Sequence, residues 1–439
     1  MSTVCVHGLG YIGLPTAAVL ADNGHEVFGY DTDQGVRDRV RNADVRIDEP
    51  GLDELLERAV ESGRLTATDE IPEAQYHIIC VPTPFDEETR RPGLEYVNAS
   101  AEAIAPLLRE GDTVILESTV PPGTTETHVR PALEASGLEA GVDFGLAHCP
   151  ETVLPGNILV ELRENDRIVG GIGPDSTAAA VELYDSFVAA AIRTTQDPTT
   201  AEFVKLIQNT FRDVNIALAN ETARIAHDYD IDTREAIDLA NGHPRVDLLS
   251  PGPGVGGHCL PIDPWFLGVG SDSMDLIPTA RKVNDGMSEF VVDLVRDLVG
   301  DLDGTKIAVL GAAYKGNVDD TRKSPGVAFA RELRRGSEVP PPATDGGSPN
   351  GPIVAVHDPH VDDASIELTD TGAASIELVD LETATTDADA VVITTDHDEF
   401  AELDPRTLRD RMSTPNVVDT KGILQLQRWR DAGFSTRRI

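Results

Sequence analysis

The sequence predicts an α/β protein with two Rossmann-like parallel-sheet domains joined by a central helical region that contains a long helix. Short apolar runs alternate with helical patterns up to about Thr195, and the same alternation returns at Lys306. From Thr199 to about Val299, apolar residues recur every three or four positions, which is typical of helices. We therefore expect domains at residues 1–197, 198–300 and 301–439 of a chain of 439 residues.

The N-terminal segment has the strand, glycine turn, helix, strand, acid order of a dinucleotide-binding unit. We expect strands over Thr3–His7 and Glu26–Tyr30, with a helix over Leu14–Asn23 between them. The turn before the helix has GxGxxG spacing, and an acid follows the second strand 18 residues after the last glycine; the residues are Gly8, Gly10, Gly13 and Asp31. The helix N-terminus would hold a pyrophosphate and the acid a ribose diol, which favours NAD over NADP.

The alternation continues with a helix around Glu95–Arg109 and further strands, which are expected at Tyr76–Val81, Thr113–Leu116, Phe144–Cys149, Arg167–Gly170 and Ala191–Thr195. Ligands of open α/β sheets bind outside the carboxyl ends of the strands. Thr83, Thr119 and Glu151 follow three of these ends, so they are candidate site residues. The alternative at each position is a turn former or a helix cap.

The central region begins with a long helical pattern that carries polar residues on one face. Lys205, Asn209 and Arg212 lie on that face at i, i+4 and i+7. A lysine and an asparagine one turn apart can hold a water or polarise a carbonyl. The alternative is a solvated charged face, which is the common case for such residues.

A second α/β unit follows, with strands expected at Lys306–Gly311, Ile353–His357, Ala390–Thr395 and Asn416–Asp419. The segment Tyr314–Pro325 carries basic residues at the ligand end of the first strand, and Arg322 could reach an anion there. The Pro-, Gly- and Ser-rich stretch Gly336–Pro352 is interpreted as a flexible surface insertion without chemistry.

The segment Gly254–Pro264 surrounds Cys259 with small residues and places Asp263 four residues after it. Glycines let backbone and ligand approach closely, and an exposed thiolate beside polar groups is a nucleophile. The alternative is an inert cysteine in a loop. Cys5 and Cys80 sit inside strand-like runs instead. Four cysteines without paired spacing or a zinc-type Cys/His cluster predict neither disulfides nor a metal site, as in a reducing compartment.

The formal charge is −40, and only six of the 36 basic residues are lysines. Because the acid is spread along the chain, we interpret it as halophilic adaptation to a salty cytoplasm and expect activity to need salt. The charge disfavours nucleic-acid binding. No apolar run approaches the roughly 20 residues that span a bilayer, and no charged-then-apolar leader precedes Val4, so we expect a cytoplasmic protein without a membrane partner.

These pieces together resemble the nucleotide-sugar 6-dehydrogenases, the family of UDP-glucose, GDP-mannose and UDP-N-acetylmannosamine dehydrogenases, over essentially the full length. The motifs in the family's order are Gly8–Pro15, Val81–Pro84, Glu117–Gly123, Glu202–Asn209, Gly256–Pro264 and Asp320–Pro325. The UDP-N-acetyl-D-mannosamine dehydrogenase branch is the most similar, on the segments Cys149–Gly156, Asn209–Ala217 and His243–Val246. One departure is Thr152, where the branch usually has arginine near the sugar.

The resemblance implies an NAD-dependent, four-electron oxidation of the C6 alcohol of a UDP-sugar to the uronic acid. Cys259 would add to the intermediate aldehyde, forming a thiohemiacetal and then a thioester. Lys205 would stabilise oxyanions or move protons, supported by Asn209 and by Asp263 near the thiol. Glu151 and Thr119 would position the water that releases the acid. UDP-N-acetyl-D-mannosamine is the expected substrate.

The resemblance also assigns binding residues and an assembly. Those expected to contact NAD, beside the glycines, are Tyr11, Ile12, Asp31, Thr83, Thr119 and Arg322. Those expected to contact the UDP-sugar are Val153, Lys205, Asn209, Arg212, His243, Arg245, Gly256, Tyr314 and Lys315. The planar fork of Arg245 suits a phosphate, whereas His243 has the alternative of capping a helix end. A homodimer or larger homo-oligomer is expected, formed by the middle helices.

Two other activities stay open at this point. A UDP-glucose 6-dehydrogenase would perform the same reaction on a different sugar. A 3-hydroxy-acid dehydrogenase shares a Rossmann half, a helical middle and a catalytic lysine, but transfers one hydride without a cysteine, so Cys259 argues against it. A sensor that binds NAD without turnover is disfavoured by the same cysteine together with Lys205 and Asp263. By analogy with the family, the product would serve cell-surface polysaccharide synthesis.

Overall fold

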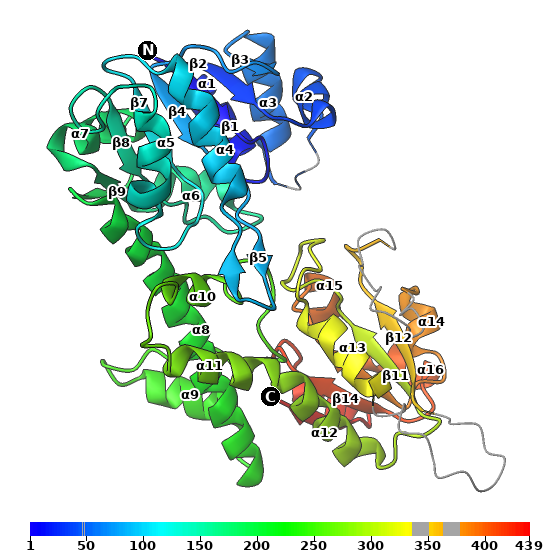
Figure 1. Ribbon diagram of the computed structural model, residues 1–439. Helices are drawn as coiled ribbons and strands as arrows, with labels where there is room; N and C mark the ends of the chain where they lie inside the picture. The colour runs from blue at the N-terminus through cyan, green and yellow to red at the C-terminus, as the bar shows by residue number, and fades with distance from the viewer. Residues whose placement is uncertain (46, 48, 336–350, 363–377) are drawn as a thin grey trace, which may run out of the picture. The chain divides into compact units, whose positions relative to one another are not determined.

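The computed structural model describes residues 1–45, 47, 49–335, 351–362 and 378–439 (Figure 1). The predicted insertion Gly336–Pro352 lies outside the described residues except for its last two positions. The chain forms two compact units: Met1–Asn209 with Ile262–Ser273, and Thr210–Pro261 with Met274–Ile439. The long predicted helix is α8 (Pro198–Asp228), which begins in the first unit and ends in the second.

The first unit is built on an eight-stranded sheet with the order β10-β9-β8-β7-β4-β1-β2-β3. Neighbouring strands are parallel except β8 and β9, which pair antiparallel with His148 opposite Gly170. The strands are β1 (Thr3–His7), β2 (Glu26–Tyr30), β3 (Leu65–Thr68), β4 (Tyr76–Ile79), β7 (Thr113–Leu116), β8 (Gly145–His148), β9 (Arg167–Gly171) and β10 (Ile192–Thr195).

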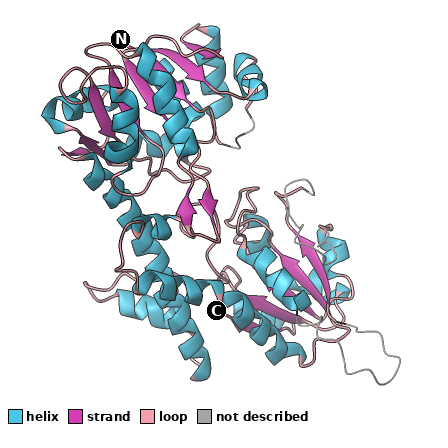
Figure 2. Cartoon of the chain, viewed as in Figure 1, coloured by secondary structure: helices cyan, strands magenta, loops and turns pink. Residues whose placement is uncertain are grey.

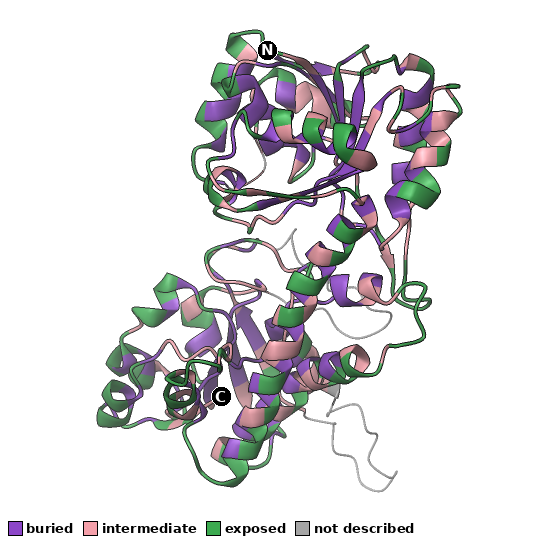
Figure 3. Ribbon diagram, turned by 90° about the vertical axis from the view of Figure 1, so that its left-hand side faces the viewer, coloured by how far each residue is buried: buried purple, intermediate pink, exposed green. Residues whose placement is uncertain are grey.

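The sheet has a hydrophobic core on each of its faces, because the side chains of a strand alternate between the two faces. Val4 and Val6 of β1 join the core beneath α1, whereas Val114 and Leu116 of β7 join the core beneath α4. Figure 3 shows the buried strands inside and exposed outer helix faces. The helices are α1 (Gly13–Asp22), α2 (Gln34–Arg41), α3 (Leu52–Glu61), α4 (Glu95–Ile104), α5 (Arg130–Glu134), α6 (Ile158–Glu164), α7 (Gly173–Tyr184) and α10 (Asp263–Leu267).

Several predicted bounds need correction. The helix expected to reach Arg109 ends at Ile104 and continues as a 3₁₀ turn, Ala105–Leu107, that contains a proline. The strand expected to reach Val81 ends at Ile79. A π-helical turn, Thr125–Val129, precedes α5, and a small antiparallel hairpin is formed by β5 (Phe85–Asp86) and β6 (Arg91–Pro92).

The second unit combines helices with a parallel sheet of order β12-β11-β13-β14-β15. Helices cover both faces of this sheet (Figure 2), and alternate strand residues again enter two cores. The strands are β11 (Lys306–Leu310), β12 (Ile353–His357), β13 (Ala390–Ile393), β14 (Asn416–Asp419) and β15 (Ser435–Arg438). The helices after α8 are α9 (Thr233–Asn241), α11 (Leu276–Asp285), α12 (Met287–Val299), α13 (Pro325–Arg335), α14 (Leu381–Thr385), α15 (Asp398–Ala401), α16 (Pro405–Arg411) and α17 (Leu426–Asp431).

A carboxylate braces the turn after the first strand of this second sheet. Asp358, just beyond β12, accepts hydrogen bonds from the backbone N–H groups of Ala312 and Ala313 at 2.6 and 2.9 Å. Its side chain is buried and also lies 3.0 Å from Nε2 of His397. The turn that follows β11 is therefore fixed from the adjacent strand end. Along the described ranges, no helix combines the length and apolar character that a bilayer span requires.

Candidate functional site

The glycine turn between β1 and α1 packs tightly against β4. A Cβ atom on Gly8 would lie 2.8 Å from the carbonyl oxygen of Cys80, and one on Gly13 would overlap the carbonyl of Gly8. Gly10 differs, because no described atom lies within 4 Å of its Cβ position. Room for a ligand therefore exists at Gly10, beside the N-terminus of α1, where backbone N–H groups favour an anion.

Asp31 holds this turn from the end of β2. Its two carboxylate oxygens accept hydrogen bonds from the backbone N–H groups of Leu9 and Asp33, each at 2.9 Å. Tyr11 is exposed and Ile12 is half-buried in the same turn. The predicted dinucleotide residues of this segment are thus neighbours, and the open position, the helix end and the acid fit the dinucleotide that the sequence predicts.

Thr83 and Thr119 lie together beyond β4 and β7. The Thr83 hydroxyl donates a hydrogen bond to the Thr119 carbonyl at 2.8 Å. The loop after Thr119 is held by Glu202 of α8, whose buried carboxylate accepts bonds from Gly123 N–H, Thr125 N–H and the Thr125 hydroxyl at 2.5, 2.8 and 2.6 Å. Burial raises the pKa of Glu202 to about 7. The motif Glu202–Asn209 includes this glutamate, but its role in holding the loop is seen only from its hydrogen bonds in the structure.

Lys205, Asn209, Asp263 and Glu151 form a buried polar cluster in the first unit. Their exposed fractions are 7%, 7%, 4% and 9%, so the solvated-face interpretation is wrong for Lys205 and Asn209. The Asn209 side-chain amide donates to Asp263 Oδ2 at 2.6 Å. Glu151 accepts a hydrogen bond from the backbone N–H of Val153. The cluster contains one ammonium, two carboxylates and one amide.

The two carboxylates of this cluster titrate unusually because of burial. Burial raises the pKa of Glu151 to about 7, and the nearby charge of Lys205 opposes that rise. Burial also raises the pKa of Asp263, against the charge of Lys205 and the Asn209 hydrogen bond. Glu151 can therefore exchange a proton near neutral pH, which suits a general base, while Lys205 supplies a positive charge without competition from solvent.

A second buried set of ionisable groups, which the sequence did not reveal, adjoins this cluster. Glu117, directly after β7, accepts hydrogen bonds from the Tyr184 hydroxyl at 3.2 Å and from the Cys80 thiol at 3.0 Å. Nη1 of Arg167, the first residue of β9, lies 3.7 Å from Glu117 Oε1. The sequence offers no signal for this set, because the burial of Arg167 is seen only in the structure.

The Cys259 loop lies in the second unit. Cys259 is exposed, whereas Cys5 and Cys149 are buried and Cys80 is half-buried. Gly257 has φ +83°, and a Cβ there would come within 2.9 Å of the Tyr314 ring. Its N–H donates to the Arg322 carbonyl at 2.9 Å. Cys259 is therefore accessible, as a nucleophile must be, and glycine is required where the loop packs on Tyr314.

Gly256 and several charged residues complete this surface. A Cβ on Gly256 would lie 2.6 Å from the Lys323 carbonyl oxygen and 2.8 Å from Tyr314 Cβ. Burial raises the pKa of Tyr314 to about 12, assisted by the negative charges of Asp320 and Cys259 and opposed by Arg322 and Arg212. These predicted residues are thus close together. The guanidinium of Arg322 binds both carboxylate oxygens of Asp320, Oδ1 at 3.0 Å and Oδ2 at 2.6 Å, and Lys315 is half-buried.

His243 and Arg245 occupy an exposed turn after α9. The His243 N–H donates to the Ala240 carbonyl at 3.0 Å, and its ring Nδ1 accepts from the Arg245 N–H at 3.3 Å. The His243 ring therefore bonds within its own turn, and Arg245 occupies an exposed position. Thr152 is half-buried, and its carbonyl accepts a bond from the Asn165 amide at 3.3 Å.

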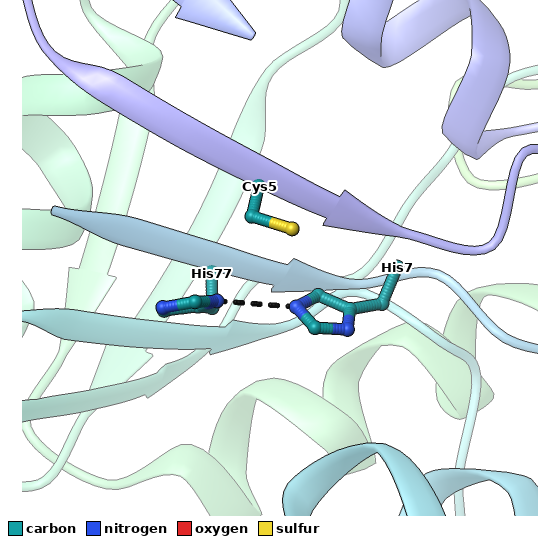
Figure 4. A group of neighbouring side chains, drawn as sticks. All are labelled: Cys5, His7 and His77. Carbon is teal, nitrogen blue, oxygen red and sulfur yellow. Dashed lines mark hydrogen bonds between the residues drawn. The ribbon is translucent and has the colours of Figure 1, made fainter. Parts of the chain in front are cut away.

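Cys5, His7 and His77 form a fully buried group on one face of the large sheet (Figure 4). Cys5 and His77 are opposite each other in the pairing of β1 with β4. His7 Nε2 and His77 Nδ1 are hydrogen-bonded at 3.1 Å, and burial lowers the pKa of both histidines. The sequence separation of 70 residues hid this group. Because the facing ring nitrogens already bond each other, we interpret it as a polar contact between strands.

Comparison with known proteins places these features in a family. Residues 2–188 match the NAD binding domain of the UDP-glucose/GDP-mannose dehydrogenase family, residues 199–286 its central domain and residues 308–426 its UDP binding domain. The UDP-N-acetyl-D-mannosamine dehydrogenase of Methanococcus maripaludis is 40% identical, over 99% of this chain and 96% of that protein. The NDP-N-acetyl-D-galactosaminuronic acid dehydrogenase of Ralstonia nicotianae is 42% identical, over 97% of each chain.

A solved structure agrees with these sequence matches. The UDP-D-ManNAc dehydrogenase from Pyrococcus horikoshii superposes with a TM-score of 0.87 and 39% identity, covering 100% of this chain and 99% of that one. The resemblance recognised from the sequence motifs is confirmed, and so is the NAD cofactor. The chain belongs to the UDP-glucose/GDP-mannose dehydrogenase family and is an NAD-dependent oxidoreductase that acts on a nucleotide sugar.

Proposed function

We propose that the enzyme oxidises UDP-N-acetyl-D-mannosamine to UDP-N-acetyl-D-mannosaminuronate, in two hydride transfers that consume two NAD. The observation that carries this proposal is Cys259, an exposed cysteine on a glycine loop packed against Tyr314. A nucleophilic thiol is what permits a second hydride transfer after the aldehyde has formed. The names of the relatives from Methanococcus maripaludis and Pyrococcus horikoshii support the choice of sugar.

The chemistry proposed for Cys259 follows from its exposure. When bound, NAD supplies the hydride acceptor. Loss of the first hydride from C6, with the hydroxyl proton passing to solvent, leaves an aldehyde, and the Cys259 thiolate adds to its carbonyl to give a thiohemiacetal. The thiohemiacetal carbon still carries a hydrogen, so a second hydride can leave, and a thioester results. Water then releases the acid and restores the thiol.

The buried cluster supplies the remaining roles. We assign to Lys205 the stabilisation of the oxyanions that form at C6, because a buried ammonium interacts strongly with a developing negative charge. Asn209 and Asp263, joined at 2.6 Å, would orient a polar group beside it. Glu151, with its pKa near 7, would take the proton of the water, and Thr119 would help to position that water.

Binding roles complete the proposal. The residues proposed to hold NAD are Gly8, Gly10, Tyr11, Ile12, Gly13, Asp31, Thr83, Thr119 and Arg322. Those proposed to hold the UDP-sugar are Val153, Lys205, Asn209, Arg212, His243, Arg245, Gly256, Tyr314 and Lys315. Because Arg322 binds both oxygens of Asp320, it would have to exchange or share that partner to contact an anion.

The glycine turn allows a test of the cofactor site. Gly10→Ala should leave folding intact, because its Cβ meets nothing within 4 Å, but should raise the KM for NAD about tenfold or more by filling the space for the pyrophosphate. Gly13→Ala should instead lower thermal stability, because its Cβ overlaps the Gly8 carbonyl. Thermal unfolding and NAD titration of both variants check this. Equal loss of stability in the two would contradict it.

The stoichiometry of NADH tests the reaction. With limiting UDP-N-acetylmannosamine, excess NAD and molar salt, we expect two NADH per sugar and none or few from UDP-glucose. Two NADH from UDP-glucose alone would establish the alternative, UDP-glucose 6-dehydrogenase. Thr152 would then be the first residue to test as a determinant of sugar specificity. One NADH per substrate would exclude the four-electron mechanism and would favour a single-step dehydrogenase instead.

We further propose that the enzyme is a homodimer formed through α8. Large apolar residues of this helix are exposed at intervals of four or seven, namely Phe203, Ile207, Phe211, Leu218, Ile225 and Tyr229. Such a stripe is costly in water and fits a second copy of the same helix. Leu218→Asp should therefore yield a monomer in light scattering at molar salt, whereas Arg224→Asp should not. A dimer that survives Leu218→Asp would contradict this assignment.

The charge of −40 supports a halophilic enzyme. Salt would screen the repulsion among its 76 acidic residues, and activity should rise as KCl is raised toward molar concentration. We place the enzyme in the cytoplasm, where NAD and UDP-sugars are available, and its product in the synthesis of a surface polysaccharide. Full activity in low salt would contradict the halophilic assignment.

A further inference from the structure

The turn that follows β11 is held at both of its ends by one buried carboxylate and one imidazole. Asp358 binds the N–H groups of Ala312 and Ala313 where the turn begins. At the other end, the Asn317 N–H donates a hydrogen bond to Nδ1 of His397 at 2.9 Å. Nε2 of His397 lies 3.0 Å from Asp358 Oδ2, so the chain of hydrogen bonds closes across the turn.

These partners determine where the proton of His397 lies. Nδ1 faces a backbone N–H, so it is the nitrogen that accepts. Burial acts to raise the pKa of Asp358, but the hydrogen bonds from His397 and from the Ala313 N–H outweigh it, so that this pKa lies below its usual value. Asp358 is therefore an anion that accepts, and Nε2 of the neutral imidazole carries the proton. Only this tautomer satisfies both neighbours.

The residues on either side of His397 hold the same turn. The Gly316 N–H donates to Asp396 Oδ1 at 3.2 Å, and the Asn317 side-chain oxygen accepts from the Asp398 N–H at 3.1 Å. A Cβ on Gly316 would overlap the Asp396 carbonyl, and Asn317 has φ +59°, in the left-handed region that few residues adopt. This end of the turn therefore packs closely on the chain before α15 and depends on its hydrogen bonds to stay there.

His397 has no exposed area and contacts two other rings. The Phe400 ring meets it edge-on at 5.3 Å and the His360 ring stacks on it at 4.7 Å, measured between ring centres. His360, His397 and Glu399 place ligand atoms close enough for a metal ion. We assign no metal there, because both nitrogens of His397 already have hydrogen-bond partners. The imidazole is instead explained by the turn that it holds.

The turn between the two anchors carries Tyr314 and Lys315, which are half-buried and for which we assign contacts to the UDP-sugar above. All members of the chain of hydrogen bonds fall within residues 308–426, which match the UDP binding domain of the family. A binding loop that is already ordered loses less conformational freedom when its ligand arrives, so it binds more tightly. Bonds that fix the turn should therefore contribute to the affinity for uridine diphosphate.

We propose that His397 is a positioning residue for the UDP-sugar: by accepting the Asn317 N–H, it holds Tyr314 and Lys315 in the conformation that binds uridine diphosphate. His397 contacts neither the substrate nor NAD in this role, and it takes no part in the chemistry at C6. The expected effect of changing it is therefore on binding. This inference rests on the binding roles proposed for Tyr314 and Lys315.

Two substitutions of His397 separate its two hydrogen bonds. The side-chain oxygen of asparagine can take nearly the position of Nδ1, whereas the side-chain nitrogen of glutamine can take nearly that of Nε2. His397→Asn should therefore keep the bond to Asn317 and a Kd for UDP within about threefold of the wild type, whereas His397→Gln should raise that Kd about tenfold, as expected for one lost hydrogen bond. Calorimetric titration of the full chain with UDP at molar salt measures both values.

Steady-state kinetics and thermal unfolding distinguish positioning from a general loss of stability. In His397→Gln the KM for the UDP-sugar should rise about tenfold, while kcat stays within about twofold of the wild type. His360→Leu is the matched control and should keep both constants, because the His360 ring packs on His397 but bonds Glu399 rather than the turn. A Kd for UDP that simply follows thermal stability across the three variants would overturn the proposal, and so would a fall in kcat without a change in KM.

A second pair of variants changes an exposed residue, so it decides the question even if the His397 variants do not fold. Asn317→Gly allows φ +59° and keeps the N–H that His397 accepts, so the Kd for UDP should stay within about threefold of the wild type. Asn317→Val is strained at that φ, should turn the N–H away from His397, and should raise the Kd about tenfold. Equal Kd values for the two variants would contradict the proposal.

Lys315→Ala separates this inference from the proposed function. If Lys315→Ala loses affinity for UDP while His397→Gln binds it as the wild type does, the binding role of the turn stands and the inference about His397 fails. If Lys315→Ala binds UDP as tightly as the wild type, the binding role proposed for Lys315 fails first, and the inference that rests on it fails as well.

Discussion

Cys259→Ala is expected to lose acid formation about a thousandfold or more, which is the order of effect seen when a catalytic nucleophile is removed. Cys259 is the exposed cysteine among the four, so its thiolate has access to ligand and solvent. Without the thiol, the aldehyde cannot become a thiohemiacetal, and its carbon offers a second hydride only through slow hydration. The remaining activity should produce at most one NADH per sugar.

The measurement combines NADH yield with chromatographic detection of the uronic acid. Cys5→Ala is the matched control, because Cys5 is buried in β1 and its pKa is raised by burial to about 12. That variant should keep two NADH per sugar, although its stability can fall. If Cys259→Ala still converted the sugar fully to the acid, the covalent mechanism would be wrong.

Lys205→Met is expected to lower kcat/KM by about a hundredfold to a thousandfold, the usual cost of removing one preorganised group that stabilises an oxyanion. The substitution keeps most of the side-chain length and removes the charge. It also leaves Glu151 and Asp263 buried without their main cation, so the pKa values of both carboxyls should rise further. Part of the loss should therefore be greater at low pH than at high pH.

The control for this change is Lys306→Met. The Lys306 ammonium, at the start of β11, donates to the carbonyls of Thr383 and Thr386, both at 2.7 Å. That variant should keep its kcat/KM. Measuring kcat and KM separately decides the role of Lys205: a rise in KM alone would mean that Lys205 only binds substrate, contrary to the oxyanion role.

The sequence predicted several strands well because their signal is local. β1, β2, β7, β12 and β14 were expected with the observed bounds, since each is a run of four or five residues that contains adjacent apolar residues. β3 and β15 were missed. Both lie at sheet edges, and β15 has the sequence Ser-Thr-Arg-Arg, with no apolar residue to mark it. A strand with few large apolar residues is recognised only by its pairing with a neighbour, which a linear pattern does not reveal.

The same limit applies to the candidate site. Helical periodicity placed Lys205 and Asn209 on one face, and the glycine spacing identified the turn that Asp31 braces. The contact between Glu117 and Arg167 joins residues 50 positions apart, and it depends on a strand that runs against its neighbour. No local sequence pattern predicts that β9 runs antiparallel to β8. The charges that surround Glu151 are therefore found only from the structure.

Asp31 and Asp358 together suggest how this architecture can be recognised after its sequence has diverged. Each stands one residue beyond a strand and receives backbone N–H groups from the turn of the adjacent strand. Only the N-terminal turn keeps GxGxxG; the other reads Gly-Ala-Ala. The second half thus lacks the glycine spacing of a phosphate-binding turn but keeps the acid that bonds to the backbone of that turn. A search of other sequences for a second nucleotide-type half should therefore look for the acid one residue beyond the strand as well as for the glycines.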